Sequence, residues 1–161
     1  MEVKLDEVFF CNLLLQTKKS PRKRSHFLLH KEVTEPVQRF CIGLEKGTYI
    51  RPQHHSKTYN WELLVVLKGS VRIIIFDSEG TIIEKFKLSH SGTLRGIEIK
   101  AGSFHTILPI TNEAIVLQVN EGPYTPTEEN DFASWAPKEG DAKAIDYLNW
   151  LVKAKPGDKY S

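Results

Sequence analysis

The stretch from Val37 to Asn120 constrains the fold most strongly, because it consists of short apolar runs separated by turn residues. The runs are rich in Val, Ile, Leu and Phe, and Gly, Ser, Asp, Asn and Lys stand between them. Many short strands at this spacing favour an all-β barrel or sandwich over alternating strands and helices. The predicted strands cover residues 37–45, 48–54, 61–68, 71–77, 81–88, 93–100, 104–110 and 114–120.

Helices are predicted at both ends of this β-rich region. Residues 1–19 and residues 142–154 each repeat apolar residues at helical intervals, and Pro21 stops the first helix. Between the strands and the second helix, residues 121–141 form a loop with three aromatic residues, which predicts that the loop packs along the domain. Residues 1–161 are therefore expected to form one domain, with the barrel at 37–120.

Composition excludes several classes of partner. A net charge of +2 among 161 residues is too balanced to indicate nucleic acid as the main partner. No apolar stretch approaches the ~20 residues that span a bilayer, and charged residues interrupt the segment after Met1, so we expect a cytoplasmic protein with no membrane partner. Cys11 and Cys41 stand among apolar residues and are predicted to be small buried hydrophobes.

The stretch RPQHH, residues 51–55, is the first candidate for a site. In a strand, alternate residues share a face, so Tyr49, Arg51, Gln53 and His55 would face one side and His54 the other. The side shared by His55 is therefore the one on which ligands are expected.

Two further residues extend this candidate site. A turn through residues 56–60 would bring Glu62 beside His55, and His105 begins a later strand after Gly102. Two imidazoles and a carboxylate presented from neighbouring strands suit divalent Fe, Mn, Ni or Zn. The alternative is a hydrogen-bonded polar pocket of the same three side chains without a metal.

The spacing of these residues resembles the two sequence motifs of the cupin superfamily. The first motif is matched by Gly47, Gln53, His55, Glu62 and Gly69, and the second by Gly102 and His105. The resemblance implies a cupin-type barrel, also called a double-stranded β-helix or jelly roll, with added N- and C-terminal helices. It also implies a metal held by Gln53, His55, Glu62 and His105. Gln53 departs from the motif, which has histidine there, and a neutral amide is a weaker ligand than imidazole.

The chain also resembles the WbuC family of cupin-fold metalloproteins over residues 20–140. The segments that carry this resemblance include SPRKRSHFLLH, GTYIRPQHH, EGPY and DFASWAPKEG. Genes of that family often lie among those for surface polysaccharides, which implies a small sugar-derived substrate. The family's reaction is not established.

Several residues keep two interpretations each. Arg51 would suit a carboxylate or phosphate of the substrate, and Tyr49 is either a proton donor in catalysis or a core residue. The basic run from Lys18 to Arg24 is either a solvated loop or an anion-binding arm, and a site role for His26 and His30 stays open.

Two functions are consistent with the sequence. The first is an enzyme acting on a small sugar-derived molecule, such as a metal-dependent isomerase or epimerase or an oxygen-using cupin. The second is a binding module that senses a small ligand or a metal without chemistry. An exposed edge strand would also make a homodimer a reasonable expectation.

Overall fold

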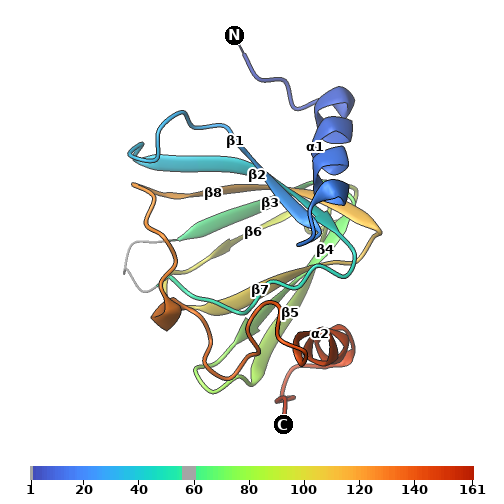
Figure 1. Cartoon of the computed structure of the whole chain (residues 1–161), viewed down its shortest axis with the longest axis vertical. Helices are drawn as coiled ribbons and strands as arrows, with labels where there is room; N and C mark the ends of the chain where they lie inside the picture. The colour runs from blue at the N-terminus through green and yellow to red at the C-terminus, as the bar shows by residue number, and fades with distance from the viewer. Residues whose placement is uncertain (1, 56–60) are drawn as a thin grey trace.

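The computed structural model describes residues 2–55 and 61–161, and its strands form two facing sheets (Figure 1). The turn expected at residues 56–60 lies outside the described residues. The strands are β1 (Arg24–Leu28), β2 (Val37–Glu45), β3 (Glu62–Lys68), β4 (Ser70–Phe76), β5 (Ile82–Ser89), β6 (Gly96–Ile99), β7 (Phe104–Pro109) and β8 (Glu113–Glu121). One sheet has the order β1-β2-β8-β3-β6 and the other the order β5-β4-β7, and all pairs are antiparallel.

The predicted strand at residues 48–54 is wrong. Among the described residues, this segment belongs to no strand and pairs only through isolated bridges of Gln53 with His105 and Phe132. Pro52 has no backbone N–H to give to a ladder, which explains why a continuous strand does not form.

The expected barrel is not closed, since strand pairing among the described residues leaves two separate sheets. The chain passes from one sheet to the other at Gly69, the single residue between β3 and β4. Gly69 has φ +72°, and a Cβ there would lie 2.4 Å from the carbonyl oxygen of Glu113. The corner therefore requires glycine, both for its backbone conformation and for the close approach of β8.

Both predicted helices are present. Helix α1 (Glu7–Lys19) begins later than expected because Asp6 is its N-cap, accepting a hydrogen bond from the backbone N–H of Phe9 at 3.0 Å. Cys11 is exposed, contrary to prediction, while Cys41 is buried. No helix in the described part of the chain is both long and apolar enough to cross a membrane.

Helix α2 (Ala144–Lys153) lies beside the smaller sheet (Figure 1) and buries the side chains of Ala144, Tyr147, Leu148 and Leu151. These side chains pack with Ile74 and Phe76 of β4 in one core cluster, while a second cluster joins both sheets. Ala133 and Ala136 of the segment before α2 are also buried in the first cluster. The remaining space between the sheets is a cavity lined by both polar and apolar side chains.

Candidate functional site

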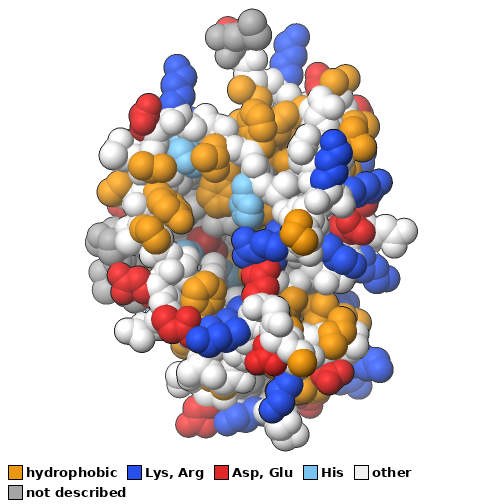
Figure 2. All heavy atoms as spheres, in the orientation of Figure 1, with side chains coloured by type: hydrophobic (Ala, Val, Ile, Leu, Met, Phe, Trp, Pro, Cys, Tyr) orange, Lys and Arg blue, Asp and Glu red, His pale blue; other side chains and the backbone are white. Residues whose placement is uncertain are grey.

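A cavity of about 550 Å³ lies between the sheets and opens at the molecular surface. Figure 2 shows this hollow near the middle of the face, with histidine, basic and acidic side chains at its edge. Its wall combines side chains from β1, β2, β3, β7 and β8 with the segments at 50–55 and 121–139. The cavity is therefore built from residues that are far apart in the sequence.

Arg51, Gln53 and His55 line the cavity, and His54 does not. The ring of His54 instead packs 4.3 Å from the ring of Phe104. The predicted division of the two adjacent histidines between opposite sides is therefore confirmed.

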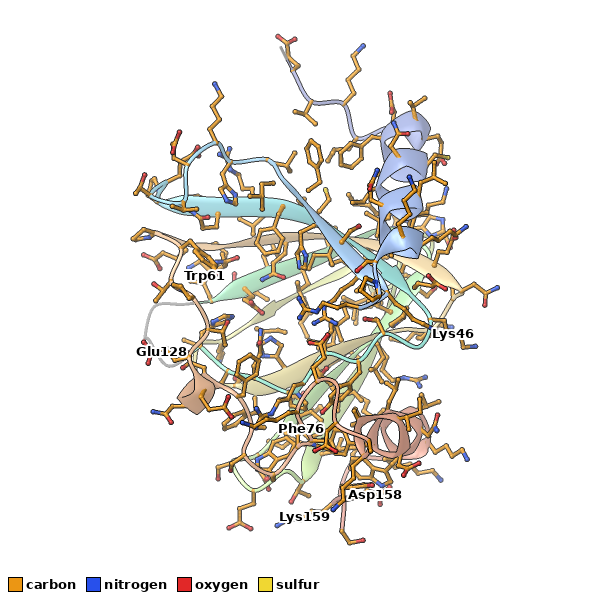
Figure 3. The ribbon with its side chains drawn as sticks, in the orientation of Figure 1. Lys46, Trp61, Phe76, Glu128, Asp158 and Lys159 are labelled. Carbon is orange, nitrogen blue, oxygen red and sulfur yellow. The ribbon has the colours of Figure 1, made fainter. Side chains whose placement is uncertain are left out.

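The backbone of Gln53 fixes this segment against β7. Its N–H donates to the carbonyl of His105 at 3.0 Å, and its carbonyl accepts from the N–H of His105 at 2.9 Å. This reciprocal bridge brings His55 and His105 to the same part of the cavity, close to Glu62 at the start of β3. Figure 3 shows Trp61, which precedes β3, and side chains from both sheets reaching into the space between them.

Glu62 is the centre of the polar cluster. Its Oε1 lies 2.6 Å from Nε2 of His55, and its Oε2 lies 2.8 Å from Nε2 of His105. Nε2 of Gln118 donates a third hydrogen bond to Oε1 at 2.7 Å. Glu62 and His105 are buried, so this carboxylate is held by side chains rather than by bulk water.

The environment favours the ionised form of this carboxylate. Burial alone would raise the pKa of Glu62, but the charge of His105 and the hydrogen bonds from both histidines lower it well below the usual range. The pKa of His105 shifts the opposite way: burial lowers it, but the negative charge of Glu62 raises it above the ordinary value. Each group therefore stabilises the charged form of the other.

The tautomer of His105 follows from its second contact. Nδ1 of His105 lies 2.8 Å from the carbonyl oxygen of Ser103, so this nitrogen must carry a proton. Nε2 then faces an oxygen of Glu62, and only a cation between the two atoms, a proton or a metal ion, makes that contact favourable. Histidine metal ligands commonly donate their other N–H to a backbone carbonyl in this way.

The donor set suits a divalent metal, but the side chains are not arranged around a common point. Within residues 2–55 and 61–161, no three His, Cys, Asp or Glu side chains form a ready-made metal site. The reason is that the carboxylate of Glu62 lies between the imidazoles, whose ring centroids are 6.3 Å apart. Zinc holds nitrogen and oxygen ligands at about 2.0–2.2 Å, so small rotations of these side chains would be needed to coordinate an ion.

Arg51 lies on the predicted side of the segment but is already hydrogen-bonded, whereas Tyr49 does not lie on that side. Arg51 lines the cavity, but its Nε and Nη2 donate to the carbonyl of Ala133 at 3.2 and 2.8 Å, and Nη1 contacts Glu129 at 3.1 Å. Tyr49 does not line the cavity, and its hydroxyl donates to the carbonyl of Pro137 at 2.7 Å. Both side chains therefore hold the segment before α2 against the sheets.

Sequence reasoning missed Gln118 as part of the site. It lies on β8, where it pairs with Phe40 of β2 and Leu64 of β3. Both of those neighbours line the cavity as well, which places Gln118 on the inner face. Strand alternation would have predicted Gln118 as a cavity residue only if the sequence had also shown which face of β8 is turned inward.

Three solved structures of known proteins are similar to this chain in fold. KdgF from Halomonas sp. is 14% identical, with a TM-score of 0.51 over 66% of this chain and 84% of that one. A conserved protein of unknown function from Streptococcus pyogenes is 16% identical, with a TM-score of 0.51 over 78% of this chain and 92% of that one. An oxalate oxidase is 16% identical, with a TM-score of 0.51 over 65% of this chain and 53% of that one.

These likenesses concern the fold, and they support the predicted cupin fold while leaving the WbuC resemblance untested. None of the curated proteins matches the sequence. The family model described as "Domain of unknown function (DUF6016)" matches residues 5–88, which is more than half of the chain. The chain therefore has a cupin fold and belongs to the DUF6016 family.

Proposed function

We propose that the protein is a cupin of the WbuC type that holds a divalent metal and a small sugar-derived molecule in the cavity between its sheets. The observation that carries this proposal is the buried carboxylate of Glu62, with Nε2 of His55 at 2.6 Å and Nε2 of His105 at 2.8 Å. A buried carboxylate facing two imidazoles is a donor set for Fe, Mn, Ni or Zn.

Gln53 would supply a fourth, weaker ligand. Its backbone is bonded to His105, and its side chain lines the cavity, so its amide lies on the same wall as the two imidazoles. When bound, the metal would act as a Lewis acid on a carbonyl or hydroxyl of the substrate. Because Glu62 and His105 stabilise each other's charged forms, this pair can also hold a proton at Nε2 of His105.

A sugar-derived substrate is supported by the amide side chains of the inner face. Gln38 of β2 pairs with Asn120 of β8, and Asn120 pairs with Glu62 of β3, so polar groups form a row across the sheet. The next inward-facing row contains Phe40, Gln118 and Leu64. Amides can bond several hydroxyls, and the apolar side chains can pack against the ring of a sugar.

The alternative is a non-catalytic cupin that senses a small ligand or a metal. Two observations favour it: an amide stands at the position of Gln53, and Tyr49, the expected proton donor, lies outside the cavity. Metal binding with no turnover of sugar derivatives would select this alternative.

The metal content of the purified protein tests the proposal. We expect protein prepared without chelator to hold about one divalent ion per chain, as measured by inductively coupled plasma mass spectrometry. His55→Ala should lose the metal, whereas His90→Ala, in a turn outside the cavity, should retain it. Absence of metal from the wild-type protein, even after incubation with each of the four ions, would contradict the proposal.

The remaining expectations are part of the same proposal. We infer one domain over residues 1–161, an assembly of two copies through the edge strand β1, and no binding of nucleic acid. Size-exclusion chromatography with light scattering would measure the number of copies of the chain in the assembly. Titration with short DNA duplexes at low salt would test the last point.

A further inference from the structure

The cavity has a second polar region, at its β1 edge, that the proposed metal site does not use. It is lined by Arg22, Arg24, His26 and Glu139. Arg24 and His26 are two residues apart on β1, so strand alternation turns both toward the cavity. This region contains the end of the basic run from Lys18 to Arg24, for which the sequence left open a solvated loop or an anion-binding arm.

One carboxylate is shared by two guanidinium groups here. Arg22 binds Glu139 through Nε at 2.7 Å and Nη2 at 2.8 Å, and Nη2 of Arg24 binds the same carboxylate at 2.6 Å. Two positive charges against one negative charge leave a net charge of +1 at the cavity wall. The hydrogen bonds from both arginines keep the pKa of Glu139 low, at about 2, so the carboxylate is ionised at neutral pH.

Arg24 is buried and makes hydrogen bonds beyond Glu139, whereas Arg22 is exposed and is held by Glu139. Arg24 is buried, and its Nη1 donates to the carbonyl of Tyr49 at 3.0 Å and to Oγ1 of Thr48 at 3.4 Å. The side chain of Arg22 is 59% exposed. Between them Lys23 has φ 56°, a conformation that is uncommon for any residue except glycine.

His26 completes the cluster from the next inward-facing position of β1. In the part of the chain that the structure describes, neither of its ring nitrogens has a hydrogen-bond partner, although its ring packs 5.8 Å from Phe40. The protein atoms around its ring and the charges of Arg24 and Arg22 lower the pKa of His26. Its nitrogens are therefore available to a ligand, and an added negative charge would favour its protonation.

This region is well separated from Glu62. Three strand-to-strand steps lead from β1 to β3. The register places His26 level with Val116 of β8, and Glu62 level with Asn120, four residues further along the same strand. With strands about 4.8 Å apart and about 3.3 Å per residue, the two regions are on the order of 15 Å apart, after allowance for the inward curvature of the sheet. A single ligand must be elongated to reach both.

We propose that Arg22, Arg24 and His26 form a subsite for the phosphate group of an elongated, phosphorylated sugar derivative whose other end reaches Glu62. This inference rests on the proposed function only in assigning a sugar to the end of the ligand that reaches Glu62. Planar guanidinium groups bind phosphate through paired hydrogen bonds, and a phosphate would replace Glu139 as the acceptor for the exposed Arg22. Arg51 is a poorer candidate because the carbonyl of Ala133 already occupies its Nε and Nη2.

Calorimetric titration with glucose-1-phosphate tests this subsite, using protein freed of metal with a chelator. We expect Arg22→Gln to weaken binding about tenfold, because a charged hydrogen-bond donor is lost. Glu139→Gln should strengthen binding, by roughly threefold to tenfold, because a competing negative charge is removed. A merely structural role of Glu139 would not strengthen binding.

The control variant is Lys19→Gln, which removes an equal charge from the end of α1, outside the cavity. It should leave the affinity unchanged, and methyl glucoside, which has no phosphate, should bind much more weakly than the phosphate ester. The subsite is overturned if no variant differs from the wild type, or if the wild type binds neither compound. Because the metal has been removed, these outcomes do not depend on the metal content that tests the proposed function.

Discussion

The two ends of the cavity use charge in opposite ways. Glu62 and His105 are buried, and among the described residues the carboxylate contacts the side chains of His55, His105 and Gln118. Around Glu139 the carboxylate is shared by two arginines, one of them exposed, so positive charge is in excess. Removing one partner of a buried ion pair leaves an uncompensated charge inside the fold, whereas an exposed excess of positive charge attracts an anionic ligand. The contrast predicts different responses to mutation, metal and salt.

The largest effect is expected from removing a partner of Glu62. His105→Ala would leave a buried carboxylate without its main positive neighbour, at a cost of about 3 kcal/mol in the free energy of unfolding. Urea denaturation measures this cost. His105→Gln, which keeps a hydrogen-bond donor, should cost less. A loss below about 1 kcal/mol for His105→Ala would mean that the pair around Glu62 does not stabilise the fold.

The second prediction concerns Gln53 at the same end. Gln53→His would replace a neutral amide on the cavity wall by an imidazole, and we expect metal affinity to rise about tenfold, or ~1.4 kcal/mol. Competition with a chromogenic chelator measures this affinity. Unfolding of the metal-free variant should match that of the wild type. An unchanged affinity would show that residue 53 does not contribute a ligand.

The third prediction concerns the exposed end. Because the pKa of Glu139 in the folded protein is about 2 and that of an unfolded glutamate is about 4.3, its ion pairs stabilise the fold at neutral pH. This contribution is lost as pH falls from about 4 toward 2. Allowing for solvent screening, we expect Glu139→Gln to cost about 1 kcal/mol at neutral pH.

Salt separates the two ends further. The difference between wild type and Glu139→Gln should shrink in concentrated sodium chloride and vanish near pH 2, as urea denaturation at several pH values would show. The loss caused by His105→Ala should persist in salt, because Glu62 and His105 are buried. Equal salt dependence at both ends would contradict the contrast between them.

Much of the fold followed from local patterns. The strand predicted at residues 37–45 is β2 with the same bounds, because alternation and bounding turns act within a few residues. The segment at 48–54 failed for an equally local reason, the missing N–H of Pro52. With no continuous strand there, alternation does not hold along the whole segment, so Ile50 lines the cavity and Tyr49 packs against Tyr147 of α2.

The two ends of the cavity also differ in how far sequence could predict them. Spacing that resembles a known pair of motifs located His55, Glu62 and His105, and the structure places both imidazoles in contact with the carboxylate of Glu62. The partner of Arg22 and Arg24 could not be found in this way. Glu139 lies 117 and 115 residues further along the chain, in a loop whose path depends on the packing of Ala133 and Ala136.

The smallest effect is expected at His54, the neighbour of His55. Nδ1 of His54 is buried and has no hydrogen-bond partner among the residues described, so His54→Leu replaces an unsatisfied polar atom by a hydrocarbon of similar size. We expect a change of less than about 0.5 kcal/mol in the free energy of unfolding, and no loss of metal. His55→Leu, the matched change one residue away, should abolish metal binding because it removes Nε2 of His55, one of the proposed ligands. Equal metal loss in both variants would mean that His54 and His55 both contribute to the metal site. That result would contradict the finding that His55 lines the cavity and His54 does not.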